Sequence, residues 1–260
     1  MSFAEIEYTA QPEPPAGLEG VTWGWRDLAL GVFVALATFF VIGAAIVGTA
    51  TAVYGKDSLE ELFAEASSAI LLEVILVTTA LLVIRRKGAG LRQLGFRGPR
   101  RGILAKSWRP WTGLLVLIVV AYFGAIASVS FYGLAVDLAG LDELLPSQQL
   151  PDDFFDHTGV IAITGLTVVF GAPIAEEIFF RGFLFGGLRR YLSLPLAGLA
   201  TGVLFASAHG DPGLIIPFAF VGAILSFTYE RSGTLLAPIA VHFIFNSVSF
   251  LILLLIPSMR

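Results

Sequence analysis

The sequence predicts an all-α polytopic membrane protein with about seven to eight transmembrane helices. Of its 260 residues, 56% are hydrophobic and 14% are charged, so the apolar share is above that of an ordinary soluble domain. A helix needs roughly 20 apolar residues to cross the ~30 Å hydrocarbon core of a bilayer, and this chain can hold seven or eight crossings with little left over. The lipid bilayer is therefore the expected surroundings of most of the chain.

Each predicted helix is an apolar segment bounded by charges, glycine or proline. The segments are about 27–53, 66–84, 110–136, 158–188, 194–209, 213–229 and 234–257. Segment 194–209 is short for a complete crossing, whereas 158–188 is long enough to tilt or to break near Pro173. Residues 1–25 are polar, acidic and proline-rich, without the pattern of a removable signal peptide, and are expected to form a flexible tail. Residues 26–260 are the expected transmembrane domain.

The loop between the second and third predicted helices sets the expected orientation. It holds nine Lys or Arg residues between Arg85 and Arg109 and no acidic residue, whereas the loops near 55–65 and 137–156 are acidic. The positive-inside rule places the basic loop, and with it the N-terminus, in the cytoplasm of a multi-pass protein of the cell membrane. A lipid-headgroup site is the alternative interpretation of this loop, and no nucleic-acid partner is expected.

Ionisable residues inside the segment 158–188 indicate a functional site, because burying a charge in a bilayer costs several kcal/mol on insertion scales. Glu176, Glu177 and Arg181 stand in an otherwise apolar sequence. Glu177 and Arg181 are one helical turn apart and are expected to form a structural ion pair, while Glu176 points roughly 100° away. No basic residue stands one turn from Glu176, which leaves it free for chemistry.

Two later segments add imidazole and amide groups at a matching depth. Segment 194–209 ends at His209, and segment 234–257 contains His242 and Asn246, again one turn apart. Counted at 1.5 Å per residue from the expected cytoplasmic turns, Glu176 and His209 lie roughly 20 Å deep and the other two roughly 13 to 20 Å deep. The four side chains are therefore expected to line one cavity within the bilayer.

This set of groups suits amide hydrolysis. A carboxylate and an imidazole that share a water can deprotonate it for attack on a carbonyl, and a second imidazole and an amide N–H can stabilise the oxyanion that develops. Two His and one Glu also form a familiar zinc ligand set, so Glu176, His209 and His242 could instead hold a divalent metal such as zinc. The chain has no Cys, which excludes thiolate ligands, disulfides and a cysteine nucleophile.

Three motifs together resemble the CAAX prenyl protease and bacteriocin-processing (CPBP, Abi-type) family of intramembrane endopeptidases. They are Glu-Glu-x-x-x-Arg at 176–181, Phe-x-x-x-His at 205–209 and His-x-x-x-Asn at 242–246, and the family core is expected at about 158–250. The basic loop also contains Leu-Gly-Phe-Arg at 94–97, which is similar to a segment of prokaryotic members. The resemblance implies seven or eight helices around an intramembrane active-site cavity.

The resemblance also implies roles for the residues. Glu176 and His209 would activate the water, and His242 and Asn246 would stabilise the oxyanion. Supporting residues would be Glu177, Arg181 and Phe205. This scheme needs no metal and no cofactor, and we favour it over the metallo-dependent alternative that the family's older description as metalloproteases keeps open.

The expected reaction is hydrolysis of a peptide bond in a CAAX-type prenylated C-terminus or in a precursor peptide. The expected partner is thus a peptide or membrane-protein substrate, with or without a lipid. The alternative is a non-catalytic membrane scaffold or bacteriocin-immunity protein of the same family. A proton-coupled transporter is disfavoured because no inverted repeat or pair of broken helices is visible.

Two further features fall outside these motifs. Glu73 is a lone carboxylate in the second predicted helix with no evident partner. Gly198, Gly202 and Ala206 recur every fourth residue, a spacing that predicts a close contact between helices rather than a ligand site.

Overall fold

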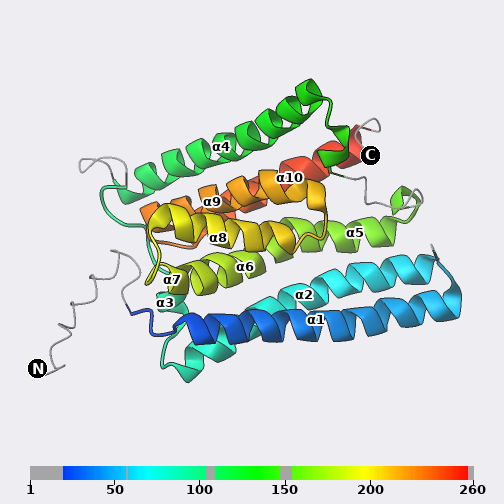
Figure 1. The fold of residues 1–260 in the computed structure, drawn as a ribbon, viewed down its shortest axis with the longest axis horizontal. Coiled ribbons are helices and arrows are strands. Elements are labelled where there is room, and N and C mark those ends of the chain that lie inside the picture. Colours follow the sequence, from blue (N-terminus) through cyan, green and yellow to red (C-terminus); the bar gives the residue numbers. More distant parts are fainter. Residues whose placement is uncertain (1–19, 57, 104–108, 147–153, 257–260) are drawn as a thin grey trace, which may run out of the picture.

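The computed structural model describes residues 20–56, 58–103, 109–146 and 154–256, so most of the predicted N-terminal tail lies outside the described residues. These residues form a bundle of helices with no strand among them (Figure 1). The first half comprises α1 Trp25–Tyr54, α2 Leu59–Arg86, the short α3 Leu91–Leu94, α4 Pro110–Ala139 and two 3₁₀ turns, η1 Asp142–Leu144 and η2 Phe154–Asp156.

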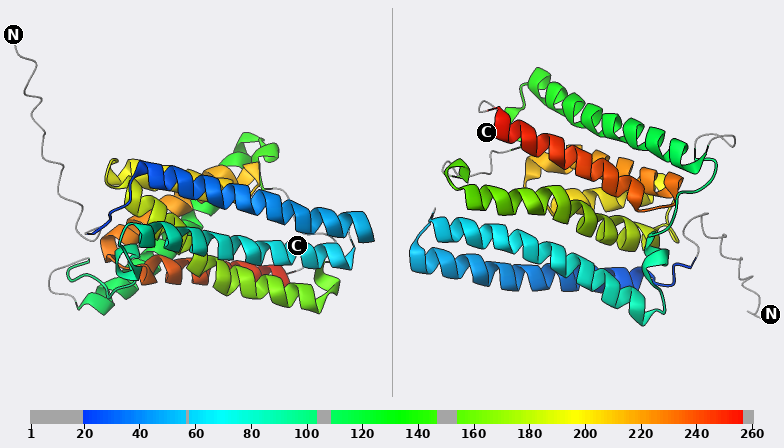
Figure 2. Two further views of the ribbon diagram at one scale, coloured as in Figure 1. Left: turned by 90° about the horizontal axis from the view of Figure 1, so that it is seen from below. Right: turned by 180° about the vertical axis from the view of Figure 1, so that it is seen from behind.

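The second half begins with one long helix of mixed character. It runs through α5 Thr158–Leu166, the π-helical η3 Thr167–Gly171, α6 Ala172–Glu176, the π-helical η4 Glu177–Phe185 and α7 Gly186–Leu188. It is followed by α8 Leu194–Ser207, the 3₁₀ turn η5 Pro212–Leu214, α9 Ile215–Ser232 and α10 Leu236–Leu255. The chain enters α1 at one end of the bundle and leaves α10 at the other (Figure 2).

The predicted polytopic all-α class is confirmed, with one qualification about the number of crossings. In the described part of the chain, six helices are long and apolar enough to cross a membrane, and they match the predicted segments to within a few residues apart from α2, which starts earlier. The seventh predicted crossing, at 194–209, is the 14-residue α8. At 1.5 Å per residue it is about 21 Å long, less than the ~30 Å of the hydrocarbon core. α8 is therefore too short for a full crossing, and the turn between α8 and α9 is expected to lie within the membrane.

The long helix 158–188 does not break at Pro173 but widens into π-helix before and after α6. Proline has no backbone N–H and its ring collides with the carbonyl four residues earlier, which disfavours a regular α-helix at that point. The backbone relaxes into wider turns, in which the Ala172 N–H bonds to the Thr167 carbonyl five residues back. Short π-helical insertions of this kind are frequent at functional sites, and Glu176 lies at the junction with the second one.

The α8–α9 contact confirms that the small residues of α8 serve close helix packing. A side-chain carbon added at Gly222 would lie 2.6 Å from the Gly202 Cα atom, and one added at Gly202 would overlap the Ala219 carbonyl oxygen. The two backbones therefore approach as closely as glycine permits, which brings the end of α8 and its histidine against α9.

Substitution at this contact is expected to destabilise the fold. Gly202→Ala should lower the free energy of unfolding by about 1–3 kcal/mol, because overpacking forces the two backbones apart. The matched control is Gly48→Ala in α1, where an added carbon meets no atom of the described residues within 4 Å and the effect should stay within about 1 kcal/mol. Melting of both variants in detergent, followed by size-exclusion chromatography after heating, measures the difference. Equal melting temperatures would contradict the packing argument.

The segment 94–97 of the basic loop clamps the turn between α9 and α10. The Tyr229 hydroxyl donates to the Leu94 carbonyl at 3.0 Å, the Leu235 N–H donates to the Gly95 carbonyl at 2.9 Å, and Arg97 Nε donates to the Gly233 carbonyl at 2.7 Å. Gly95 has a φ of 107°, a conformation that side-chain-bearing residues rarely adopt. This loop therefore holds the start of α10, the helix that carries His242.

Candidate active site

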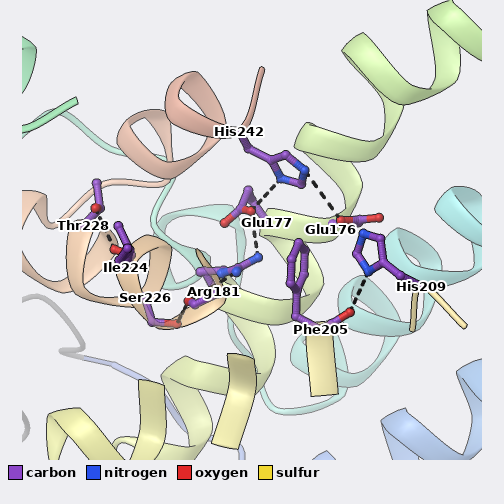
Figure 3. Close-up of polar contacts among 10 residues, drawn as sticks. Glu176, Glu177, Arg181, Phe205, His209, Ile224, Ser226, Thr228 and His242 are labelled. Carbon is purple, nitrogen blue, oxygen red and sulfur yellow. Dashed lines mark hydrogen bonds and ion pairs between the residues drawn. The ribbon is translucent and has the colours of Figure 1, made fainter. Parts of the chain in front are cut away.

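A buried ion-pair network joins η4 to α10. Arg181 Nη1 donates to Glu177 Oε1 at 2.7 Å, and both side chains are fully buried, which confirms the predicted pair. His242 Nδ1 lies 2.9 Å from the same carboxylate oxygen (Figure 3). An ionised carboxylate only accepts hydrogen bonds, so His242 Nδ1 carries the proton and the Nε2 atom faces away from Glu177.

The Arg181 guanidinium has three kinds of contact that offset its burial. Besides Glu177, it donates through Nη2 to the Gly222 carbonyl at 3.3 Å, and it lies over the Phe205 ring with the Cζ atom 4.4 Å from the ring centroid. Phe205 is thus a cation–π partner as well as a neighbour of both histidine rings. Phe205, which the sequence predicts to be a supporting residue, lies on α8 at the contact with Arg181 of η4.

The Phe-x-x-x-His spacing determines which ring nitrogen of His209 carries the hydrogen. Its Nδ1 atom is 2.9 Å from the Phe205 carbonyl oxygen, one helical turn back. A carbonyl only accepts, so Nδ1 carries the hydrogen and the neutral ring keeps its lone pair on Nε2. The end of α8 therefore presents an imidazole nitrogen that can accept a proton or a hydrogen bond from a water.

Asn246 is held by the irregular backbone of the long helix. The Val168 carbonyl has lost its α-helical donor, since the Ala172 N–H bonds to Thr167, and its π-helical donor would be residue 173, a proline without an N–H. The Asn246 amide fills this vacancy, with Nδ2 donating to the Val168 oxygen at 2.8 Å. One amide hydrogen is therefore engaged, and the second is available to another acceptor.

Glu176 stands apart from the ion pair, as the helical geometry predicts. Its Oε2 atom is 3.9 Å from His242 Nε2, beyond hydrogen-bonding distance, and this buried oxygen has no hydrogen-bond partner in the described part of the chain. A buried carboxylate oxygen without a partner is costly. The gap between Glu176 and His242 is a place where a polar molecule would be stabilised.

A small cavity adjoins these groups. Its volume is about 20 Å³, which exceeds the ~10–15 Å³ that one water molecule requires. The polar groups on its wall come from His209, His242 and Asn246, and Phe205 and apolar side chains of α4, α9 and α10 complete it. Three of the four predicted cavity residues thus line one enclosed space, while Glu176 lies beside it across the 3.9 Å gap to His242.

Glu73 is a neighbour of the site that the sequence interpretation left unexplained. It is buried on α2, which packs against α6, and its carboxyl group lies near enough to that of Glu176 for the two to repel each other when both are ionised. The ionisable group nearest in effect to Glu73 is thus another carboxyl group, Glu176, on a neighbouring helix. The sequence could have indicated this proximity, because both residues lie at the same expected depth in the membrane. Glu73 is 13 residues before Arg86, and Glu176 is 13 residues before Arg189.

In the described part of the chain, the donor groups are not arranged to bind a metal ion. Among the described residues, no group of three His, Cys, Asp or Glu side chains is arranged so that it could hold a metal, and this includes Glu176, His209 and His242. Phe205 and Glu177 engage the Nδ1 atoms of the two histidines, a contact that metal-binding imidazoles also make, so the lack of three converging side chains decides the point.

Comparison with known proteins points to one family. Residues 158–248 match the family model described as type II CAAX prenyl endopeptidase Rce1-like. The chain is 25% identical over 199 residues to the membrane-embedded CAAX protease MroQ of Staphylococcus aureus (strain USA300), a match that covers 73% of this chain and 74% of MroQ. No solved structure matches.

Two other relatives match over shorter stretches. YdiL of Bacillus subtilis (strain 168), named as a membrane peptidase, is 33% identical over 75 residues, which are 29% of this chain and 31% of YdiL. An uncharacterized 24.3 kDa protein of Escherichia coli is 31% identical over 140 residues, 51% of this chain and 64% of that protein. The chain thus covers less than two thirds of either relative. The matched segment 158–248 contains all three motifs, and in this segment the chain is similar to the CAAX protease-like (CPBP) family of membrane proteins.

Proposed function

We propose that this protein is an intramembrane endopeptidase that hydrolyses a peptide bond with a water molecule activated by Glu176 and His209. The observation that carries the proposal is the 20 Å³ cavity walled by His209, His242 and Asn246, with the carboxylate of Glu176 beside it, whose Oε2 atom has no hydrogen-bond partner among the described residues. Similarity to the family supports the same class of reaction, since the family model and MroQ are both described as CAAX proteases or endopeptidases.

In the proposed reaction, Glu176 acts as general base and then as general acid. Its carboxylate accepts a proton from the water, whose oxygen attacks the carbonyl carbon of the substrate. The C–N bond then breaks, and the same proton passes to the leaving amine nitrogen. His209 accepts a hydrogen bond at Nε2 and orients the water, because its Nδ1 hydrogen is engaged by the Phe205 carbonyl.

The oxyanion that forms on the substrate carbonyl is stabilised from α10. Glu177 holds His242 through Nδ1, and in its imidazolium form the ring donates to the oxyanion from Nε2. Asn246 donates its second amide hydrogen while the first stays on the Val168 carbonyl. Both donors are fixed before substrate arrives by partners on the long helix 158–188, which is the preorganisation that oxyanion stabilisation requires.

The remaining features of the proposal concern surroundings and substrate. We assign the reaction to a metal-free mechanism in the cell membrane, with the N-terminus and the 85–109 loop in the cytoplasm, as the positive-inside rule indicates. The substrate is a precursor peptide or a CAAX-type C-terminus, and lipid modification of it is not required by the chemistry above.

Comparison of protein termini tests the proposal without a known substrate. Membranes from cells that express the wild type or Glu176→Ala are analysed by mass spectrometry of protein N- and C-termini. New termini that occur only with the wild type are the expected result. Identical termini, with both proteins shown to be folded by their melting behaviour, would contradict the enzyme and favour a non-catalytic scaffold or immunity protein.

A further inference from the structure

A groove of about 640 Å³ runs along the outer half of the bundle between the long helix and α10. Its walls come from Thr164 on α5, Val168 on η3, Leu214 on η5 and Asn246, Ser249 and Leu253 on α10. A volume of this size lies within the ~300–1,000 Å³ of ordinary ligand sites. The groove exists because the short α8–α9 hairpin ends before α5 and α10 do, so that α8 and α9 do not cover the space between these two helices at that end.

The groove and the candidate active site meet at one residue. Asn246 lines both the groove and the 20 Å³ cavity, and its contact with the Val168 carbonyl forms the inner end of the groove. From Asn246 to Leu253 the groove follows α10 for about 10 Å at 1.5 Å per residue. An extended peptide rises about 3.3 Å per residue, so roughly three residues fit between the cavity and the mouth.

The lining and the charge of the mouth indicate what would bind. Apart from Asn246 and the hydroxyl groups of Thr164 and Ser249, the wall is apolar. The mouth lies beside η1 and η2, which carry Asp142, Glu143 and Asp156, and no Lys or Arg occurs in the sequence between Arg109 and Arg181. A peptide with an apolar segment next to a Lys or Arg would complement both the apolar wall and the acidic mouth.

We propose that the α5–α10 groove binds an extended apolar stretch of about three residues of the peptide substrate, followed by a Lys or Arg at the acidic mouth. This proposal rests on the proposed endopeptidase function and specifies its substrate class. The substrate then reaches the active site from the end of the bundle opposite the 85–109 loop. The hydroxyl groups of the wall supply partners for the backbone of the extended chain, which would otherwise lose its hydrogen bonds on leaving water.

A pair of tryptophan substitutions on α10 tests the groove. Ser249→Trp fills it, whereas Leu251→Trp is the matched control, because Leu251 is 52% exposed and is not part of the groove wall. Termini that depend on the wild type are quantified in membranes that contain each variant. We expect Ser249→Trp to lower their yield at least tenfold and Leu251→Trp to leave it within twofold. Melting of each variant reports whether the fold is intact.

The same experiment reads out the class of substrate and separates the two proposals. Apolar residues beside the new termini, with Lys or Arg within about three to six residues on one side, are the expected sequence pattern. Two results would overturn the groove assignment but not the proposed peptidase function. One is cleavage by Ser249→Trp at the level of the Leu251→Trp control. The other is cleavage sites that carry a lipid-modified residue in place of the Lys or Arg. Absence of wild-type-dependent termini would instead overturn the proposed function itself.

Discussion

Glu176→Gln is expected to lower the rate of cleavage by about 10²- to 10⁴-fold, the range that general acid–base catalysis contributes. The amide has nearly the shape of the carboxylate but cannot take the proton of the water. Burial of the side chain is preserved, and since Oε2 has no hydrogen-bond partner in the described residues, the substitution removes no such bond there. The loss should therefore appear in kcat, with little change in KM or in melting temperature.

Glu60→Gln is the matched control, because Glu60 is an exposed carboxylate in the first turn of α2. Rates are compared on one precursor chosen from the wild-type-dependent termini. If Glu176→Gln cleaves that precursor at the wild-type rate, another group must take the proton and the assigned mechanism is wrong.

Arg181→Met is expected to lower the free energy of unfolding by about 3–5 kcal/mol, which is the range for breaking a buried ion pair from one side. Glu177 would keep its charge in a fully buried position with only His242 as a partner. The cation–π contact with Phe205 and the bond to the Gly222 carbonyl would be lost as well. Because Glu177 orients His242, residual folded protein should also be impaired in catalysis.

Two further variants separate the loss of the Glu177–Arg181 ion pair from the loss of a positive charge alone. Arg92→Met removes an exposed guanidinium from α3 and should change stability by less than about 0.5 kcal/mol. The double variant Glu177→Gln/Arg181→Met should be more stable than the sum of the single effects predicts, since it leaves no unpaired charge. Strict additivity of the two single effects would contradict a direct interaction.

Local features of the fold and of the site were predictable because they depend on residues that are close in sequence. The helical segments follow from the apolar stretches and their charged or glycine boundaries, and the structure places them where the sequence predicts, with the exception that α2 starts about seven residues earlier. The Glu177–Arg181 pair follows from i,i+4 spacing alone. Depth arithmetic likewise predicted that His209, His242 and Asn246 share a cavity.

The π-helical form of the segment 158–188 was only partly predictable. Pro173 indicates an irregularity, but a break, a kink and a π-helical widening are all ways to accommodate a missing N–H. The choice depends on whether another helix can satisfy the freed carbonyl. Here Asn246 of α10 does so at Val168, and Trp23, which is buried just before α1, donates its indole N–H to the Phe183 carbonyl at 2.8 Å.

By itself, the sequence determined the all-α membrane class, the positions of the helices, the ion pair within one turn and the three motifs. Only the tertiary structure decided that His242 binds Glu177, that Glu73 lies near Glu176, and that a groove extends along α10 from Asn246 to Leu253. The physical reason is that periodicity fixes the face and depth of a side chain on its own helix. Which helices become neighbours depends on packing between distant segments, such as the glycine contact of α8 with α9.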